Sequence, residues 1–283
     1  VDLGGGLMAL QFDQHGRLLS KLPVAVNLPI PVLLGPLVVP LPGRGALAAM
    51  ARAAARLQTL ELIFPEEFEE DLAHYADWLA PRLTDEGFEQ VPDSWQPRYL
   101  EVEADPGASL DVLDAETLRL VDKARLRWPE AVIGARLPLS SQAAELALGW
   151  VKAGVGVIHL WSDDIGQDLD GRYLPEALQA VHTRLVEDAV RDRVSLVVSG
   201  GIAAAEHVAK AIACGADLAA VDFILQVAWG CSLWADRGKC PVESRPIEPD
   251  WGAQRIVNLM NAWRDQLLEA LGAMGLRLSL IHI

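Results

Sequence analysis

Short runs of apolar and β-branched residues recur along the chain and alternate with longer segments in which apolar residues are spaced three and four apart. Ser195–Ser199 (SLVVS) and Leu218–Val221 (LAAV) have the composition of strands that are buried on both faces. Residues 203–213 between them are rich in helix formers, and Gly215 follows where a helix end tolerates a positive φ. The segment therefore predicts a βαβ unit with two parallel strands.

The same alternation extends over most of the chain. Further strands are predicted at 31–34, 59–63, 88–91, 98–103, 132–137 and 157–160. Helices are predicted at 46–57, 65–81, 114–128 (capped by Asp114), 142–153 (capped by Ser141), 175–190 and 251–272. This series of strand–helix units predicts an α/β fold, a (β/α)8 TIM barrel, with a doubly wound open sheet as the alternative.

The predicted elements divide the chain into four parts. Residues 1–30 form an N-terminal arm, residues 31–250 the barrel and residues 251–277 a C-terminal helix. Residues 278–283 (LSLIHI) fit nothing before them and are interpreted as foreign sequence, such as read-through from a sequencing adapter.

Composition and charge narrow the class of protein. The chain has 283 residues, of which 51% are hydrophobic and 22% charged, enough for a sizeable core. A formal net charge of −15 argues against binding to nucleic acid or to an anionic membrane. Prolines interrupt the apolar stretch at 28–41, so no predicted helix spans a bilayer.

Cysteine usage bears on the compartment. The chain has three cysteines, Cys214, Cys231 and Cys240, too few for a disulfide framework. No signal-peptide pattern is present. The chain begins without Met, so a signal peptide that has been removed is the alternative. A reducing compartment, the cytoplasm, is predicted.

The loops after the strands of a (β/α)8 barrel carry its functional groups. Gly200 and Gly201 follow the strand at 195–199, and residues without Cβ let backbone amides approach a ligand closely. The next helix adds its positive end, so this turn is a candidate phosphate site; a tight turn without a ligand is the alternative. The other polar or small residues at predicted strand ends are Gly35, Glu103, Arg136, Ser162, Asp163, Asp164, Ser199 and Asp222.

The last third of the chain carries a series of motifs in a fixed order. It reads LVEDAVRDRV at 185–194, VSGG at 198–201, CGAD at 214–217, GC at 230–231 and CPV at 240–242. This series resembles the FMN-binding (central or alpha-subunit-like) domain family of glutamate synthase, which reads L-V-E-x-G-L-R-D-R-V-x-L-x-V-D-G-G, then L-G-A-D, G-T-A-A-L-x-x-x-G-C and C-P-V-G. Residues 28–35, Glu101 and Arg136 align more loosely with earlier strands of the family.

The resemblance implies an FMN-linked oxidoreductase barrel that converts 2-oxoglutarate and ammonia into glutamate through a reduced 2-iminoglutarate. Gly200 and Gly201 match the family's flavin-phosphate loop, Ser199 directly precedes them, and Ser162 can be placed on the family's motif after the sixth strand. These residues and Arg136 are the predicted cofactor-binding set. Arg136, which would bind a carboxylate or the flavin, and Asp164, which would position the amine or imine, are the predicted catalytic residues.

The implied partners are a small-molecule substrate and an electron-donating or glutaminase subunit, with no nucleic acid and no membrane. In the family, electrons arrive through a [3Fe–4S] cluster held by C-x5-C-x4-C. This chain keeps Cys231 and Cys240, with Arg237 at the spacing of the middle cysteine. Because two thiolates cannot hold such a cluster, we predict that this chain alone binds no iron–sulfur cluster.

Other departures from the family fall at the predicted chemistry. WSDDIG at 161–166 stands where the family has S-G-H-D-G-G. Glu103 replaces a lysine, which reverses the charge at this lip and disfavours an anionic dicarboxylate. Asp222 stands among small residues of the family, where it would repel a phosphate; an N-cap role is its alternative. Arg136 replaces a lysine and keeps the charge; an ion pair with an acidic neighbour is its alternative.

Three hypotheses follow. The first is a divergent FMN-dependent oxidoreductase of the glutamate synthase type, acting on 2-oxoglutarate or in a related amino-acid conversion. The second is an inactive barrel that serves as a subunit or scaffold. The third is a lyase or aldolase that uses carboxylates such as Asp163, Glu101 and Asp222 for acid–base work or Mg²⁺. His15, His74, His159, His182 and His207 show no ligand spacing and are assigned no role.

Overall fold

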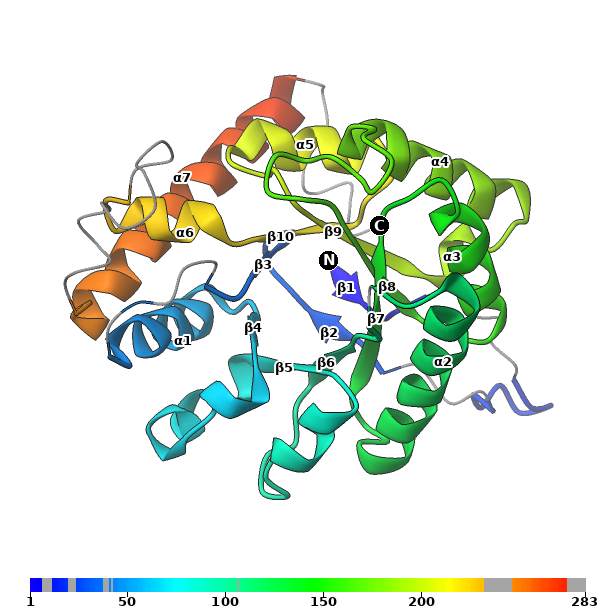
Figure 1. Cartoon of the computed structure of the whole chain (residues 1–283), viewed down its shortest axis with the longest axis horizontal. Coiled ribbons are helices and arrows are strands. Elements are labelled where there is room, and N and C mark those ends of the chain that lie inside the picture. Colours follow the sequence, from blue (N-terminus) through cyan, green and yellow to red (C-terminus); the bar gives the residue numbers. More distant parts are fainter. Residues whose placement is uncertain are drawn as a thin grey trace.

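A computed structural model describes residues 1–6, 12–19, 24–37, 41, 43–105, 107–231 and 246–273. Its centre is a closed barrel of parallel strands in the order β10-β3-β4-β5-β6-β7-β8-β9 (Figure 1). The predicted (β/α)8 TIM barrel is confirmed, and the open sheet is excluded because β10 pairs with β3. The strands are β3 Val32–Leu34, β4 Glu61–Ile63, β5 Leu79–Leu83, β6 Tyr99–Val102, β7 Val132–Pro138, β8 Val157–Trp161, β9 Ser195–Ser199 and β10 Leu218–Val221.

Helices surround the barrel and connect its strands (Figure 1). Strand residues of one parity face these helices and form the larger apolar cluster, which includes Leu100, Ile158 and Val198. Each helix turns an apolar stripe toward that layer, which is why helical spacing located most of them. The helices are α1 Gly45–Leu57, α2 Leu110–Arg127, α3 Ala143–Lys152, α4 Leu174–Glu187, α5 Ala205–Ala213, α6 Phe223–Ala228 and α7 Pro249–Ala273.

The third strand of the barrel lies at a different place from the one that the sequence predicts. The predicted helix at 65–81 is wrong: this region holds the 3-10 segments η1 Pro65–Glu67 and η2 Glu70–Trp78, followed by β5. The predicted strand at 88–91 is wrong as well, since it falls on the 3-10 segment η3 Glu86–Gln90 and the end that follows it. Pro81 hid β5, because a proline cannot donate to a strand ladder and is disfavoured within sheets.

Two predicted helix caps are also wrong. Asp114 lies inside α2, where its carboxylate accepts a hydrogen bond from Trp150 Nε1 at 2.7 Å. α3 begins after Gln142, and no side chain caps it. By contrast, Gly215 follows α5 with a φ of 111°, as the helix-end pattern predicts.

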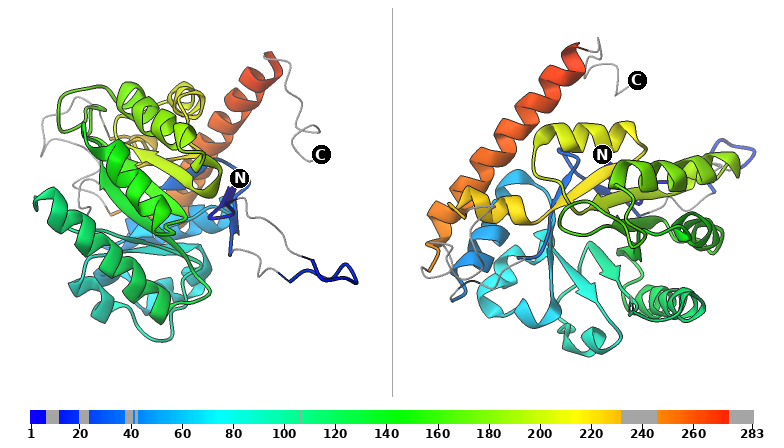
Figure 2. Two further views of the ribbon diagram at one scale, coloured as in Figure 1. Left: turned by 90° about the vertical axis from the view of Figure 1, so that its right-hand side faces the viewer. Right: turned by 45° about the horizontal axis from the view of Figure 1, so that its top comes forward.

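The N-terminal arm closes one end of the barrel. β1 Asp2–Leu3 pairs with β2 Val26–Asn27 in a separate antiparallel sheet. Leu3, Val26 and Leu28 are buried in a second apolar cluster with inward-facing strand residues such as Val157 and Val197. Residues 12–19 project away from the barrel, as Figure 2 shows.

The C-terminal helix α7 packs along the outside of the barrel beside α1 and α5 (Figure 2). Within the described residues, no helix has the length and apolar character needed to cross a membrane. Residues 278–283 and Cys240 lie outside the described part of the chain, so the predictions made for them stay predictions.

Candidate functional site

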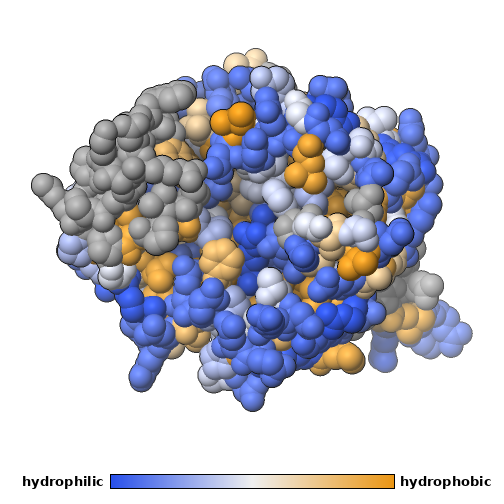
Figure 3. Space-filling model, in the orientation of Figure 1, coloured by the Kyte–Doolittle hydropathy of each residue, from blue (hydrophilic) through white to orange (hydrophobic). Residues whose placement is uncertain are grey.

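Polar side chains fill the barrel interior near the carboxyl ends of its strands. Along each strand, residues that face the barrel interior alternate with residues that face the helices. The interior residues nearer the amino ends of the strands, such as Ala80, Tyr99 and Val157, are apolar or aromatic. The residues two positions further on are Arg82, Glu101, Arg136, His159 and Ser199, from β5, β6, β7, β8 and β9. In the space-filling view along the barrel, hydrophilic residues surround the hollowed centre of the molecule (Figure 3). This layer is the candidate site.

Glu101 lies at the centre of the layer. It is fully buried and accepts hydrogen bonds from Tyr99 Oη at 2.9 Å and from His159 Nδ1 at 2.7 Å. Arg136 Nη1 lies 3.4 Å from its second oxygen. Burial by itself raises the pKa of Glu101, but His159, Arg136 and Tyr99 outweigh it and lower the pKa to about 2. Glu101 is therefore an ionised carboxylate.

His159 connects Glu101 to the mouth of the barrel. Its side chain is 1% exposed, and its Nε2 lies 2.9 Å from Ser199 Oγ. Burial lowers the pKa of His159, and the charge of Arg136 adds to this against the opposite effect of Glu101, so the imidazole is neutral near pH 7. The Glu101 carboxylate can only accept a hydrogen bond and Arg136 Nη1 can only donate one, and both lie against Nδ1, at 2.7 and 3.0 Å. The shorter contact assigns the proton to Nδ1, so Nε2 accepts from the Ser199 hydroxyl.

Arg136 is held in ion pairs. Its Nε donates to Glu103 at 3.0 Å, its Nη1 lies 3.0 Å from His159 Nδ1, and its side chain is 7% exposed. Arg82 Nε donates to the second oxygen of Glu103 at 2.7 Å. The ion pair with an acidic neighbour, offered as the alternative for Arg136, is thus present; its roles in substrate or flavin binding stay predictions.

The Gly200–Gly201 turn packs closely against the loop after β8. Gly200 has a φ of 103° and Gly201 a φ of 66°, both strained for other residues. A Cβ at Gly200 would lie 2.7 Å from the Asp163 carbonyl oxygen, and one at Gly201 would lie 2.7 Å from the Gly166 amide nitrogen. Ser162 Oγ, in the same loop, donates to the Ser199 carbonyl at 3.2 Å. The loop contact explains both glycines without a ligand.

The acidic residues of the mouth have separate local roles. Asp163 shapes its own loop, because its Oδ1 accepts from the amides of Ile165 and Gln167 at 3.1 and 2.7 Å. Asp164 is exposed. Asp222 accepts from the Phe223 amide at 2.5 Å, which confirms the N-cap alternative, and burial raises its pKa. The charge of Asp164 also raises the pKa of Asp222. The described residues include no group of three or more side chains that could hold a metal ion.

Sequence reasoning missed Arg82 and His159. Arg82 lies on β5, the strand that its proline hid, and His159 has no metal-ligand spacing. The available signal for His159 was its place in VIHLW, where a single polar residue shares the inward parity of Val157. A polar residue inside a buried strand needs partners, and the same alternation along β9, the next strand, and β6, two strands away, indicates Ser199 and Glu101.

Gly134 makes room for Tyr99 beside this network. A Cβ at Gly134 would overlap the Tyr99 hydroxyl and lie 3.0 Å from Tyr99 Cζ. Gly134→Ala is therefore expected to lower the free energy of unfolding by about 1–3 kcal/mol through overpacking, measured by urea denaturation. Tyr99→Phe removes the overlapping hydroxyl, so the double variant should be more stable than the sum of the single effects predicts. Strict additivity would contradict this account.

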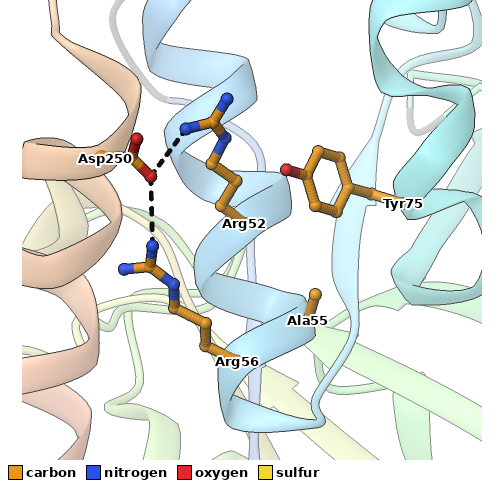
Figure 4. A pocket seen from close by; sticks show the side chains of 5 residues that line it. All are labelled: Arg52, Ala55, Arg56, Tyr75 and Asp250. Atoms are coloured by element: carbon orange, nitrogen blue, oxygen red, sulfur yellow. Dashed lines mark hydrogen bonds and ion pairs between the residues drawn. The ribbon is translucent and has the colours of Figure 1, made fainter.

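A separate cavity lies outside the barrel between α1, η2 and α7. Its volume is about 280 Å³, and Figure 4 shows the residues that line it. Asp250 bridges Arg52 at 2.7 Å and Arg56 at 3.1 Å. The bridge joins α7 to α1, and the polar layer of the barrel takes no part in it.

Comparison with known proteins supports the relationship that the motifs indicate. Residues 162–277 match the family described as the conserved region in glutamate synthase. The archaeal-type glutamate synthase [NADPH] of Thermotoga neapolitana is 31% identical over 192 residues, which cover 60% of this chain and 38% of that protein. The archaeal glutamate synthase [NADPH] of Methanocaldococcus jannaschii is 31% identical over 147 residues, covering 48% and 28%. The chain thus spans well under half the length of these relatives.

Among solved structures, a flavocytochrome b2 mutant with pyruvate bound superposes with a TM-score of 0.61 at 16% identity. The superposition covers 94% of this chain and 69% of that one, and it shows a shared barrel fold. The family match includes β9, the Gly200–Gly201 turn and α5. The sequence matches and the closed barrel together support a relationship between this chain and the glutamate synthase family.

Proposed function

We propose that the chain forms the FMN-binding barrel of a glutamate synthase-type oxidoreductase. Its reaction would be the reductive amination of 2-oxoglutarate to glutamate or a related amino-acid conversion. The observation that carries the proposal is the Ser199–Gly201 turn at the carboxyl end of β9. It lies within the matched region, has positive φ at both glycines and leads into α5.

The residues around this turn suit a phosphate-bearing cofactor. The two glycines present backbone amides without a Cβ, and α5 begins four residues after Gly201 with no side chain capping it. At the end of β8, the indole Nε1 of Trp161 is buried and has no hydrogen-bond partner among the described residues, and an unpaired buried donor of this kind calls for a partner such as a ligand. Ser199, Gly200, Gly201 and Ser162 would hold the phosphate end of FMN, and FMN would supply reversible hydride transfer.

Charge at the mouth bears on the substrate. Arg82 and Arg136 face Glu101 and Glu103, so the four charges cancel within the layer. A dicarboxylate would have to compete with Glu103 for Arg136, whereas an amino acid carries its own cation as well as a carboxylate. We therefore propose Arg136 as the carboxylate-binding residue and the exposed Asp164 as the residue that meets an amine or imine. No iron–sulfur cluster is proposed for this chain, and an electron-donating or glutaminase subunit is the proposed partner.

An inactive barrel acting as a subunit or scaffold is the second candidate. It is favoured by the loop contact that accounts for Gly200 and Gly201, and by the ion pairs of Arg136. Asp222, which lies beside Gly35 at the end of β10, also counts against an anion there.

Flavin binding separates the two candidates. The oxidoreductase predicts a visible flavin spectrum in the purified protein, or one recovered on incubation with excess FMN. Gly201→Ala should weaken FMN binding about tenfold or more, because displacing one amide–phosphate hydrogen bond costs about 1.5–3 kcal/mol. The matched control is Gly171→Ala, since Gly171 has a φ of 82° but no atom within 4 Å of an added Cβ.

Fluorescence titration with FMN measures both variants, and circular dichroism checks that each is folded. Equal FMN affinities for the two folded variants would contradict the placement of the phosphate at Gly201. No binding by the unaltered chain would refute the oxidoreductase and leave the scaffold.

A further inference from the structure

We propose that Ser199 is an activated nucleophile that accepts an acyl group, with His159 as its general base and Glu101 as the group that orients the base. This activity goes beyond the proposed oxidoreductase. It uses the Ser199–Gly201 turn that the oxidoreductase would give to the FMN phosphate, so a bound FMN would block it and the test is made on flavin-free protein.

The three side chains form a continuous hydrogen-bonded line. Ser199 Oγ lies 2.9 Å from His159 Nε2, and His159 Nδ1 lies 2.7 Å from Glu101 Oε1. A hydroxyl bonded to an imidazole that is itself oriented by a carboxylate is the arrangement of nucleophilic serine enzymes on unrelated folds. The arrangement is recognised by its geometry and not by its order in the chain.

The surroundings fix the proton positions that this chemistry needs. Glu101 is completely buried and is held as a carboxylate by Tyr99 Oη and Arg136. It therefore keeps the His159 proton on Nδ1 and leaves the Nε2 lone pair toward the serine. The three residues sit on β6, β8 and β9, so the barrel itself holds the distances between them.

Ser199 is placed where a substrate can reach it. It is the last residue of β9, at the mouth of the barrel, and it is partly exposed whereas the four residues before it are buried. Gly200 and Gly201 follow, and their amides carry no side chain that would block a carbonyl oxygen. In nucleophilic serine sites the amide after the nucleophile commonly stabilises the oxyanion. In the family pattern this position is Asp, so the hydroxyl is a feature of this chain.

The acyl-transfer step balances without a redox partner. Ser199 Oγ attacks the acyl carbon of an ester, an Oγ–C bond forms, and the hydroxyl proton moves to His159 Nε2. The bond from the acyl carbon to the alkoxy oxygen breaks, and the leaving alcohol takes that proton. Water then attacks the acyl-serine through the same base, which releases the carboxylic acid and restores the hydroxyl.

A fluorophosphonate probe tests the proposal on the full chain, because it phosphonylates an activated serine with loss of fluoride. We expect one adduct by intact mass, mapped to Ser199 by peptide mass spectrometry. Ser199→Ala should abolish it, and His159→Gln should slow labelling about 100-fold or more, the range for loss of a general base. Ser141→Ala is the control, since Ser141 is an exposed hydroxyl in a surface loop.

The outcomes are distinct from those of the flavin test. No adduct on the folded chain, an adduct on another residue, or undiminished labelling of folded His159→Gln would each overturn the proposal. Labelling is carried out on protein whose absorbance shows no flavin, and FMN binding is measured on a separate sample, so a failure to label leaves the oxidoreductase to be judged by its own result.

Discussion

Glu101→Gln is expected to lower the free energy of unfolding by about 3–5 kcal/mol, as removal of one partner from a buried ion-pair network does. The variant leaves Arg82 and Arg136 with a single carboxylate, Glu103, inside the barrel. An uncompensated cation in this environment cannot regain the solvation that it has in the unfolded chain. Urea denaturation followed by circular dichroism measures the change.

The double variant Glu101→Gln/Arg136→Gln provides the control. It removes one charge of each sign and leaves the Arg82–Glu103 pair balanced. We expect it to be less destabilised than the sum of the two single variants, with a coupling energy of about 1–3 kcal/mol. Purely additive effects would show that the charges of Glu101 and Arg136 do not stabilise one another.

The effect should also depend on pH. The pKa of Glu101 is about 2 in the folded chain, below its ordinary value of 4.5, so its ionised form stabilises the folded state above pH 4.5. That contribution is lost as the pH falls through the window from 4.5 to about 2. The difference in unfolding free energy between the unaltered chain and Glu101→Gln should therefore be constant at neutral pH and shrink in this window. If this difference in unfolding free energy stays constant as the pH falls from 4.5 to about 2, the pKa of Glu101 in the folded chain is not lowered in the way described.

Leu3→Ala is expected to lower the free energy of unfolding by about 2–5 kcal/mol, the cost of truncating a fully buried leucine. Leu3 is 0% exposed and packs at the closed end of the barrel with Val26 and Val157. The lost methyl groups leave a cavity that the paired strands around it cannot collapse to fill. Thermal and urea unfolding report the change.

Leu19→Ala is the matched control for this variant. Leu19 belongs to the same N-terminal arm and is 64% exposed, so the same substitution there should change stability by less than about 0.5 kcal/mol. Similar effects at the two positions would mean that the arm does not seal the barrel.

Local pattern was sufficient for most of the barrel. Ser195–Ser199 and Leu218–Val221 were predicted with their observed bounds, because each is a short apolar run between turn-forming residues. The pattern failed at β5, where Pro81 interrupts the strand signal. It also failed at β1 and β2, since strands of two residues have no period of their own and exist only through their pairing.

The sequence predicts which residues lie at the mouth of the barrel, but it does not predict which of their side chains contact one another. The rule that functional groups follow barrel strands identified Glu103, Arg136 and Ser199 as residues of the mouth. It could not say that Arg136 would meet Glu103, or that Glu101 would meet His159 across 58 positions of sequence. Those partners are set by the register between strands and by closure of the barrel, which no local window contains.

The contact between the N-terminal arm and the barrel has a consequence for the order of folding. The Gly4 amide donates to Ser195 Oγ at 3.1 Å, across 191 positions of sequence. Residues 1–6 leave the ribosome long before Ser195 is made. Their apolar side chains therefore lack their native contacts while the strands of the barrel are being synthesised. Contacts of such high sequence separation form late, and chains that depend on them fold slowly and expose surface meanwhile. In pulse-labelling hydrogen exchange during refolding, the Gly4 amide should thus gain protection after the helical amides of α2 and α4.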